Sequence, residues 1–297
     1  MKLRRRTALA GTAAWAASAG LTRNTRAEAT RSPHWTLRDI DVPGERDIGR
    51  RFTLLIPTAP RQEPVPLLVA LHGLGETHDQ RVGAYAWVER YGLGSSYDRL
   101  CAPPVKRVSR RARHWTDARL AEVNAMLKAQ PFRGLAIACP YTPNVYRARR
   151  GRQATLDRYA SWLVEEVVPR ARREAGASKR TYLGGCSLGG YVGMEVFLRQ
   201  SQHFDAWGCV QGALGLHRVA GYAERLAARA ATEGAKPLHL ETSTGDPFKS
   251  HHEALSKHLR KAELEHEMIV PPGPHNQPFL RDSGTLEMLL WHDRLAR

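Results

Sequence analysis

Short apolar runs alternate with longer segments of helical periodicity along most of this chain. Continuous apolar runs are typical of strands buried on both faces, whereas apolar residues that recur every three or four positions predict amphipathic helices. The predicted strands are 34–43, 50–57, 66–73, 134–140, 180–186, 206–212, 237–243 and 265–272. The predicted helices are 117–130, 155–176, 188–200, 217–234, 251–263 and 285–296.

The order of these elements predicts an α/β fold. The first two strands are joined by a turn that contains glycine, which favours an antiparallel start. From residue 66 onward strand and helix alternate, which is typical of a mostly parallel central sheet with helices on both faces. We therefore predict a single α/β domain over residues 30–297. In such sheets the chemistry lies at the carboxyl ends of the strands.

The N-terminal residues differ from the rest of the chain. A basic segment at 1–6 precedes a mildly apolar stretch rich in Ala and Gly at 7–21, and Ala27-Glu28-Ala29 offers a cleavage site. This pattern predicts an export signal at 1–29 and a periplasmic or extracellular protein. The consecutive arginines resemble a twin-arginine leader. A disordered basic tail of a cytosolic protein is the alternative. No apolar run approaches the roughly 20 residues of a membrane-spanning helix.

The formal net charge of +16 changes this picture little. The leader carries part of it, and the basic clusters at 106–114 and 147–152 fall in predicted loops without a recognisable nucleic-acid motif. We therefore expect a solvated basic face and no nucleic-acid partner, with attraction to anionic surfaces or acidic substrates left open.

The four cysteines form no CxxC pair and have no metal-type spacing, so we predict no metal site. Cys139, Cys186 and Cys209 lie within or at the ends of apolar runs, which predicts buried free thiols. Disulfides are the alternative for an exported chain, and the sequence leaves the redox state of Cys101, Cys139 and Cys209 open.

A candidate nucleophile follows the strand at 180–186. Ser187 is the centre of a Gly185-x-Ser187-x-Gly189 pattern between a predicted strand and a predicted helix. A sharp turn of this kind holds the serine in a strained conformation, and side chains at the two glycine positions would collide across it. The neighbouring Cys186 ends the buried strand, so its thiol should point away from the substrate, with a raised pKa, and stay inert.

An acid and a histidine follow two later strands. Asp246 comes just after the strand at 237–243, and His275 just after the strand at 265–272. His275 would accept the Ser187 proton, and Asp246 would fix its tautomer and stabilise the imidazolium. The other acids fit less well, since one precedes its strand, one lies inside its strand and one follows the histidine (Asp205, Glu241 and Asp282).

An oxyanion hole is predicted from backbone N–H groups. His72-Gly73-Leu74-Gly75 follows the first buried parallel strand, so we assign one donor to the N–H of Leu74 and the other to the N–H of Leu188, the residue after the nucleophile. We expect His72 to orient this loop and not to react.

Four segments carry a family resemblance: LLVALHGLGET, LVEEVVPRARREAGASKRTYLGGCSLGGYVGMEVFLR, TSTGDPF and GPHNQPF. Together they resemble the serine esterases of the α/β-hydrolase superfamily, in particular the esterase D-like and the phospholipase/carboxylesterase groups, over roughly residues 50–290. The resemblance implies an α/β-hydrolase fold and hydrolysis of a carboxylic ester or thioester, small or polymeric, with no cofactor. An acyltransferase or a peptidase would use the same triad, and a non-catalytic basic surface-binding module is the alternative from another class.

The segment at 76–133 is long for these families and predicts an insertion that could act as a lid. Its aromatic residues Tyr85, Trp87, Tyr91 and Trp115 are candidates to line an acyl or aryl pocket. For any single one of them, packing of the insertion against the body of the protein is the favoured alternative.

Overall fold

The computed structural model describes residues 31–59, 63–109 and 111–296, so the predicted leader at 1–29 lies outside the described residues. One sheet of eight strands has the order β1-β2-β4-β3-β5-β6-β7-β8. The strands are β1 (Trp35–Asp41), β2 (Arg51–Pro57), β3 (Leu67–Leu71), β4 (Ala136–Pro140), β5 (Thr181–Cys186), β6 (Ala206–Val210), β7 (Leu238–Glu241) and β8 (Glu267–Ile269). Every predicted strand is present.

The sheet is antiparallel only at its start. β1 pairs with β2, and β2 pairs with β4, in antiparallel register, whereas β3 to β8 pair in parallel. The five residues of β3 and the six of β5 are all buried, because each of these central strands has both faces covered. The prediction of a mostly parallel sheet with an antiparallel start is confirmed.

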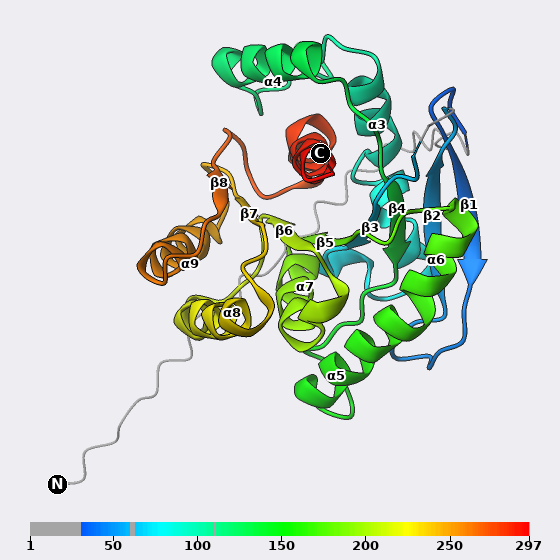
Figure 1. Cartoon of the computed structure of the whole chain (residues 1–297), viewed down its shortest axis with the longest axis vertical. Helices are drawn as coiled ribbons and strands as arrows, with labels where there is room; N and C mark the ends of the chain where they lie inside the picture. The colour runs from blue at the N-terminus through cyan, green and yellow to red at the C-terminus, as the bar shows by residue number, and fades with distance from the viewer. Residues whose placement is uncertain (1–30, 60–62, 110, 297) are drawn as a thin grey trace, which may run out of the picture.

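Helices cover both faces of the sheet, as predicted (Figure 1). One face carries α5 (Arg152–Trp162), α6 (Val168–Ala175), α7 (Leu188–Arg199), α8 (Val219–Glu233) and α9 (Lys249–Lys261), and the other carries α3 (Leu93–Cys101), α4 (Asp117–Ala129) and α11 (Thr285–Arg294). Alternate side chains of β3 enter two separate cores: Val69 packs below α7, and Leu68 packs below α11.

Most of the segment at 76–133 is part of this layering. It forms the helical turn η1 (Leu74–Glu76), the short helices α1 (Gln80–Ala84) and α2 (Ala86–Glu89), and then α3 and α4. Trp87 and Tyr97 are fully buried in the second core beside α11. The body of this segment therefore helps to cover one face of the sheet with its large side chains, and its action as a lid stays a prediction.

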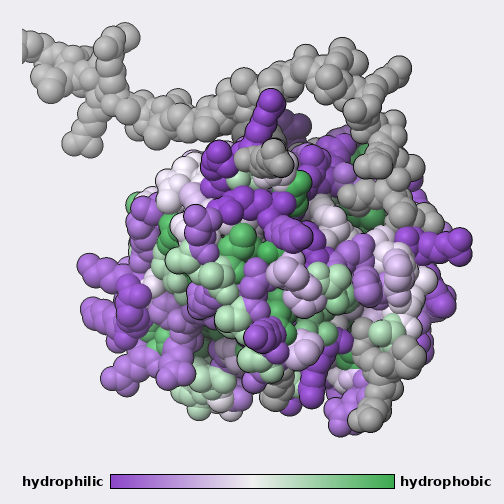
Figure 2. All heavy atoms as spheres, turned by 90° about the horizontal axis from the view of Figure 1, so that it is seen from above, coloured by the Kyte–Doolittle hydropathy of each residue, from purple (hydrophilic) through white to green (hydrophobic). Residues whose placement is uncertain are grey.

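The face of the molecule seen in Figure 2 is mainly polar. Hydrophilic side chains dominate the view in Figure 2, and apolar side chains gather only in small areas between them. Within the described ranges, no helix has the length and apolar character needed to cross a membrane. Cys139, Cys186 and Cys209 are buried free thiols, as predicted.

Candidate active site

The turn between β5 and α7 holds Ser187 in a backbone conformation that few residues adopt. Its φ of 52° and ψ of −117° lie outside the ordinary regions for a residue with a side chain. A Cβ on Gly185 would lie 2.5 Å from the Gly189 carbonyl oxygen, and a Cβ on Gly189 would lie 2.2 Å from the Leu71 carbonyl oxygen. The predicted strain and the predicted need for both glycines are confirmed.

The structure brings Ser187, His275 and Asp246 into one chain of contacts. Nε2 of His275 lies 3.1 Å from Oγ of Ser187, and its Nδ1 lies 2.9 Å from Oδ1 of Asp246. The ring of Phe248 packs edge-on against the imidazole at a centroid distance of 5.3 Å. Both ends of the imidazole are thus within hydrogen-bond reach of a partner, so it can take a proton from Ser187 while Asp246 holds its orientation.

Asp246 is a buried carboxylate that accepts several hydrogen bonds. Its side chain has no exposed surface. The Oγ1 of Thr242 donates to it at 2.6 Å, and the N–H of Phe248 donates at 3.0 Å. Burial disfavours the charge, but the hydrogen bonds from His275, Thr242 and Phe248 outweigh this effect, so the pKa of Asp246 lies below its usual value. The rival acids have other surroundings: Asp282 is buried and accepts from the N–H of Val108, and Glu241 is fully buried within β7.

Cys186 is not positioned as a nucleophile. Burial raises the pKa of its thiol well above the usual value, and the charge of Glu76 raises it further. This agrees with the predicted inert thiol. Its position differs in one respect from the prediction, because Cys186 is among the residues that line the small cavity beside Ser187.

The two predicted oxyanion donors occupy equivalent places. Leu74 is the first residue of η1, and Leu188 is the first residue of α7. The N–H of a first helical residue has no partner within its helix, so it is available to a ligand. Gly73 adopts an extended conformation before η1, which turns this loop toward Ser187. His72 braces the loop from below: its Nδ1 lies 2.8 Å from the Gly73 carbonyl oxygen, and its Nε2 accepts from the Thr142 N–H at 2.8 Å.

A small cavity of about 30 Å³ opens beside Ser187. It is lined by the loop after β3, by the segment that begins at His275 and by four residues from elsewhere (Gly73, Leu74, Gly75, Glu76, His275, Asn276, Gln277 and Leu280, with Tyr91, Cys186, Ser187 and Gln211). Of the four aromatic residues predicted to line a pocket, Tyr91 alone is among them.

The other three aromatic residues do not line this cavity. The hydroxyl of Tyr85 donates to Asp39 on β1, 3.0 Å away, and Arg81 lies over its ring. Trp87 is fully buried and packs edge-on against Tyr91. Trp115 is also buried, and its indole N–H donates to the carbonyl of Asp282 at 2.9 Å. Trp87 and Trp115 therefore belong to the second core, and Tyr85 lies against β1.

A carboxylate that the sequence did not reveal lies in the same cavity. Glu76 is only 3 % exposed, and it accepts a short hydrogen bond from the hydroxyl of Tyr91. The same hydroxyl accepts from the N–H of Gly73 at 3.2 Å. Arg90 lies 3.3 Å from the other carboxylate oxygen of Glu76. Tyr91 and Glu76 therefore fix the loop that presents the N–H of Leu74.

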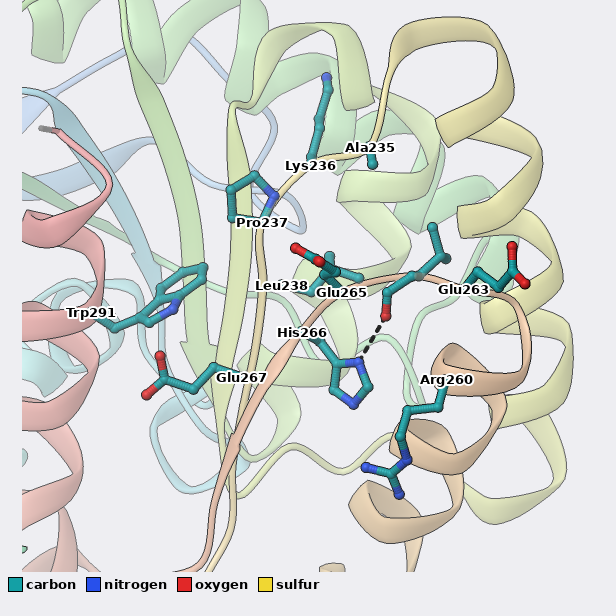
Figure 3. Close-up of a pocket in the computed structure, with 11 residues that line it drawn as sticks. Ala235, Lys236, Pro237, Leu238, Arg260, Glu263, Glu265, His266, Glu267 and Trp291 are labelled. Atoms are coloured by element: carbon teal, nitrogen blue, oxygen red, sulfur yellow. Dashed lines mark hydrogen bonds between the residues drawn. The ribbon is translucent and has the colours of Figure 1, made fainter.

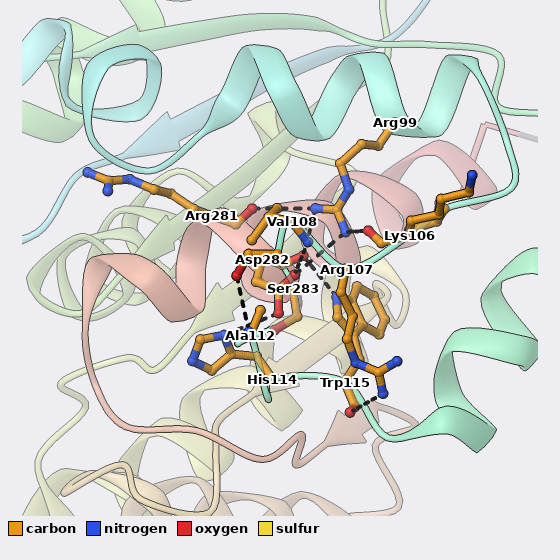
Figure 4. A network of polar contacts seen from close by, with 12 residues as sticks. Arg99, Lys106, Arg107, Val108, Ala112, His114, Trp115, Arg281, Asp282 and Ser283 are labelled. Carbon is orange, nitrogen blue, oxygen red and sulfur yellow. Dashed lines mark hydrogen bonds and ion pairs between the residues drawn. The ribbon is translucent and has the colours of Figure 1, made fainter. Parts of the chain in front are cut away.

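Two further polar groups hold the loop that carries His275. Nε2 of Gln211 donates to the Ser243 hydroxyl at 2.7 Å and to the Pro274 carbonyl at 3.1 Å. On the other side, the buried Asp282 accepts from the N–H of Val108 at 3.0 Å and lies 3.2 Å from Nδ1 of His114 (Figure 4). The ring of His114 packs against that of Phe279, just after the histidine.

A second, wider pocket of about 1030 Å³ lies away from these residues. It is lined by the segment that leads into β7, by the turn between α9 and β8, and by Trp291 of α11 (Figure 3). Lys236, Arg260 and three glutamates are among its lining residues, so its charges are mixed. Because it contains none of the three triad candidates, it is not the place where Ser187 could react. Across the described ranges, no cluster of three His, Cys, Asp or Glu side chains could hold a metal ion.

No family model and no curated protein matches the sequence. Solved structures do match. A ferulic acid esterase has a TM-score of 0.61 at 15% identity, over 88% of this chain and 99% of that one. An S-formylglutathione hydrolase from Staphylococcus aureus has a TM-score of 0.60 at 15% identity, over 89% of this chain and 98% of that one. The enterobactin hydrolase IroE in complex with DFP has a TM-score of 0.53 at 14% identity, over 89% of this chain and 97% of that one.

Proposed function

We propose that this chain is a serine hydrolase that cleaves carboxylic esters or thioesters through an acyl-enzyme. It has the α/β-hydrolase fold that its resemblance to the serine esterases implied. The contact that carries the proposal is the chain from Ser187 through His275 to Asp246, with distances of 3.1 and 2.9 Å. The names of the similar structures, which include esterases and hydrolases, support the same chemistry.

In the proposed reaction, Oγ of Ser187 attacks the ester carbonyl carbon while its proton passes to Nε2 of His275. The carbonyl oxygen becomes an oxyanion and accepts from the N–H groups of Leu74 and Leu188, each worth about 3–4 kcal/mol of barrier. The bond to the alcohol or thiol breaks, and the imidazolium returns the proton to the leaving group. Water then repeats these steps on the acyl-enzyme and frees the acid and Ser187.

The acyl side of the substrate is proposed to be short. The cavity beside Ser187 measures about 30 Å³, and its walls include the polar side chains Glu76, Gln211 and Gln277. A long alkyl chain would not fit there without displacing buried side chains. A series of p-nitrophenyl esters should therefore show the highest kcat/KM for the shortest acyl groups.

Export through the leader at 1–29 is a separate proposal that rests on the sequence alone.

The proposal is tested by labelling with a fluorophosphonate probe and by hydrolysis of p-nitrophenyl acetate. Ser187→Ala should lose both, and Cys186→Ala should keep most of the activity, because the buried thiol takes no part in the chemistry. A parent protein that neither labels nor hydrolyses any ester of the series would refute the enzyme assignment. Loss of activity in Cys186→Ala with normal folding would instead give the thiol a role.

A further inference from the structure

The large apolar side chains that are exposed in this protein are not scattered evenly. Among the described residues they are Leu74 at 46 %, Val108 at 49 %, Tyr146 at 51 %, Leu216 at 54 % and Val270 at 38 %. Four of the five follow the carboxyl ends of parallel strands, namely β3, β4, β6 and β8. Because the carboxyl ends of parallel strands meet at one edge of a sheet, these four residues share the edge that carries Ser187.

Contacts tie this apolar edge directly to the candidate active site. Leu74 lines the cavity beside Ser187. Tyr146 stacks on Tyr191 with an interplanar angle of 17°, and the N–H of Tyr191 donates to the Ser187 carbonyl at 3.3 Å. The guanidinium of Arg218 lies 4.6 Å from the centre of the Tyr191 ring. These contacts place Leu74 at the cavity and join Tyr146 and Arg218 to α7, the helix that begins beside Ser187. Leu216 and Val270 are assigned to the same edge because they follow β6 and β8.

Two loops of the same edge are strongly cationic. The loop after β4 exposes four arginines (Arg147, Arg149, Arg150 and Arg152), and residues 141–152 contain no acid. The loop at 105–115 is also free of acids, exposes Arg111 and Arg113, and is held beside the His275 loop by Asp282. Of the acids in the loops after β3 and β7, Glu76 and Asp246 are buried, and Asp79 caps α1 at the surface. The turn between β1 and β2, also at this edge, exposes Glu45 and Asp47, and both pair with Arg158. Arg150 has an acidic neighbour, Glu45, at 3.7 Å.

We propose that this edge, which we call the rim, docks on an anionic lipid surface. The rim is defined by Leu74, Tyr146, Leu216, Val270 and the arginines at 147–152. Exposed Leu, Tyr and Val among arginines match the boundary of a membrane, where apolar groups enter the acyl region and cations remain with the headgroups. A polyanion without apolar groups would satisfy the arginines but leave the aliphatic side chains in water. Docking would face the Ser187 entrance toward the lipid, and this catalytic consequence rests on the proposed function, whereas the docking itself does not.

The test is cosedimentation of the full chain carrying Ser187→Ala with two kinds of vesicle. One contains equal parts of phosphatidylglycerol and phosphatidylcholine, and the other contains phosphatidylcholine alone. We expect binding to the first and little to the second. Because each basic residue near an anionic surface contributes about a fivefold change in affinity, Arg147→Glu with Arg149→Glu should weaken binding by about tenfold or more. Leu216→Ser with Val270→Ser should weaken it severalfold.

The matched control reverses two exposed lysines at the opposite edge of the sheet. Lys179 precedes β5 and Lys261 precedes β8, so Lys179→Glu with Lys261→Glu changes the net charge equally but leaves the rim intact. Affinity should be nearly unchanged in this control. An equal loss in the control and the arginine variant would overturn the proposal, because net charge alone would then explain binding. Unchanged affinity for the anionic vesicles in Leu216→Ser with Val270→Ser would also overturn the proposal. Binding to soluble polyglutamate as tight as binding to these vesicles would do the same.

A separate measurement isolates the enzyme activity. Hydrolysis of soluble p-nitrophenyl acetate is followed with Ser187 intact and without vesicles. Hydrolysis without vesicle binding refutes the docking alone, and vesicle binding without hydrolysis refutes the proposed function alone.

Discussion

The hydroxyl of Tyr91 offers the sharpest test of how the candidate oxyanion loop is held. Tyr91→Phe removes one oxygen atom and leaves the ring in place. That oxygen accepts from the Gly73 N–H at 3.2 Å and donates to Glu76. Gly73 directly precedes Leu74, the proposed oxyanion donor, so a shift of its peptide would move the Leu74 N–H. The variant therefore tests stability and catalysis through one atom.

The size of the effect follows from the burial of both partners. Glu76 is 3 % exposed and Tyr91 is 3 % exposed, so water reaches neither group freely. A hydrogen bond to a charged group contributes about 1.5–3 kcal/mol, and a buried N–H left without a partner costs about 1–3 kcal/mol. Arg90 and Gln277 still contact the carboxylate, which reduces the loss. We expect the free energy of unfolding to fall by about 2–4 kcal/mol.

Catalysis should suffer beyond this loss of stability. If the Leu74 N–H moves out of position, about 3–4 kcal/mol of oxyanion stabilisation is weakened, and kcat should fall by about tenfold or more with little change in KM. The assay is steady-state hydrolysis of p-nitrophenyl acetate at a temperature at which the variant is fully folded, combined with urea denaturation.

Tyr97→Phe is the matched control. The hydroxyl of Tyr97 also connects backbone groups, with the Leu135 N–H at 3.2 Å and the Leu135 carbonyl at 3.3 Å, and it is fully buried in the second core away from Ser187. This variant should lose a similar amount of stability and keep its kcat. If Tyr91→Phe also keeps its kcat while losing stability, Tyr91 is a core residue and the proposed support of the oxyanion loop is refuted.

Two further predictions concern buried acids outside the reaction. Burial and the charge of Glu287 hold the pKa of Glu241 well above its usual value of 4.5, so the folded state keeps this group protonated and the free energy of unfolding should fall as the pH rises above about 4.5. In urea denaturation, the free energy of unfolding of Glu241→Gln relative to the parent should therefore be higher at pH 8 than at pH 5. The same difference between variant and parent at the two pH values would contradict this. Asp282 is fully buried between Val108 and His114, so Asp282→Ala should cost about 3–5 kcal/mol. The control is Asp117→Ala, which removes an ion pair with Arg107 in which the Asp117 side chain is 94% exposed. Calorimetry should show only a small loss of stability for this variant. Equal losses of stability in the two variants would mean that the burial of Asp282 does not matter.

The strands, the helices and the three triad candidates could be predicted from sequence because their signals are local. Continuous apolar runs predict the burial of β3 and β5, and the turn at Ser187 needs glycines two positions before and after it. His275 and Asp246 lie far apart in sequence, yet each follows a strand, and the parallel sheet brings strand ends together. A local pattern plus one topological rule was therefore enough to place them at one edge.

The cavity could not be predicted in the same way, because its walls depend on which long-range partner each side chain meets. Tyr85, Trp87 and Tyr91 lie within seven residues of one another in a single helical segment. Tyr85 meets Asp39 on β1, Trp87 fills the second core, and only Tyr91 reaches Gly73. The spacing of these residues in the sequence does not indicate which partner each side chain contacts. Glu76 has an equally ordinary local sequence, and its contacts are with Tyr91 and Arg90, which lie in the turn after α2.

The adjacent Cys186 and Ser187 have different roles although they are one residue apart. Cys186 is still part of β5, paired with Val210, so its thiol is buried where ionisation is costly. Ser187 is the first residue beyond the ladder, and its positive φ lifts its side chain off the sheet toward His275. The intrinsic nucleophilicity of a thiol exceeds that of a hydroxyl, yet position outweighs it, because a group that cannot reach the base or lose its proton cannot attack. The glycines at 185 and 189 permit this step, so backbone geometry favours Ser187 over Cys186 as the proposed nucleophile.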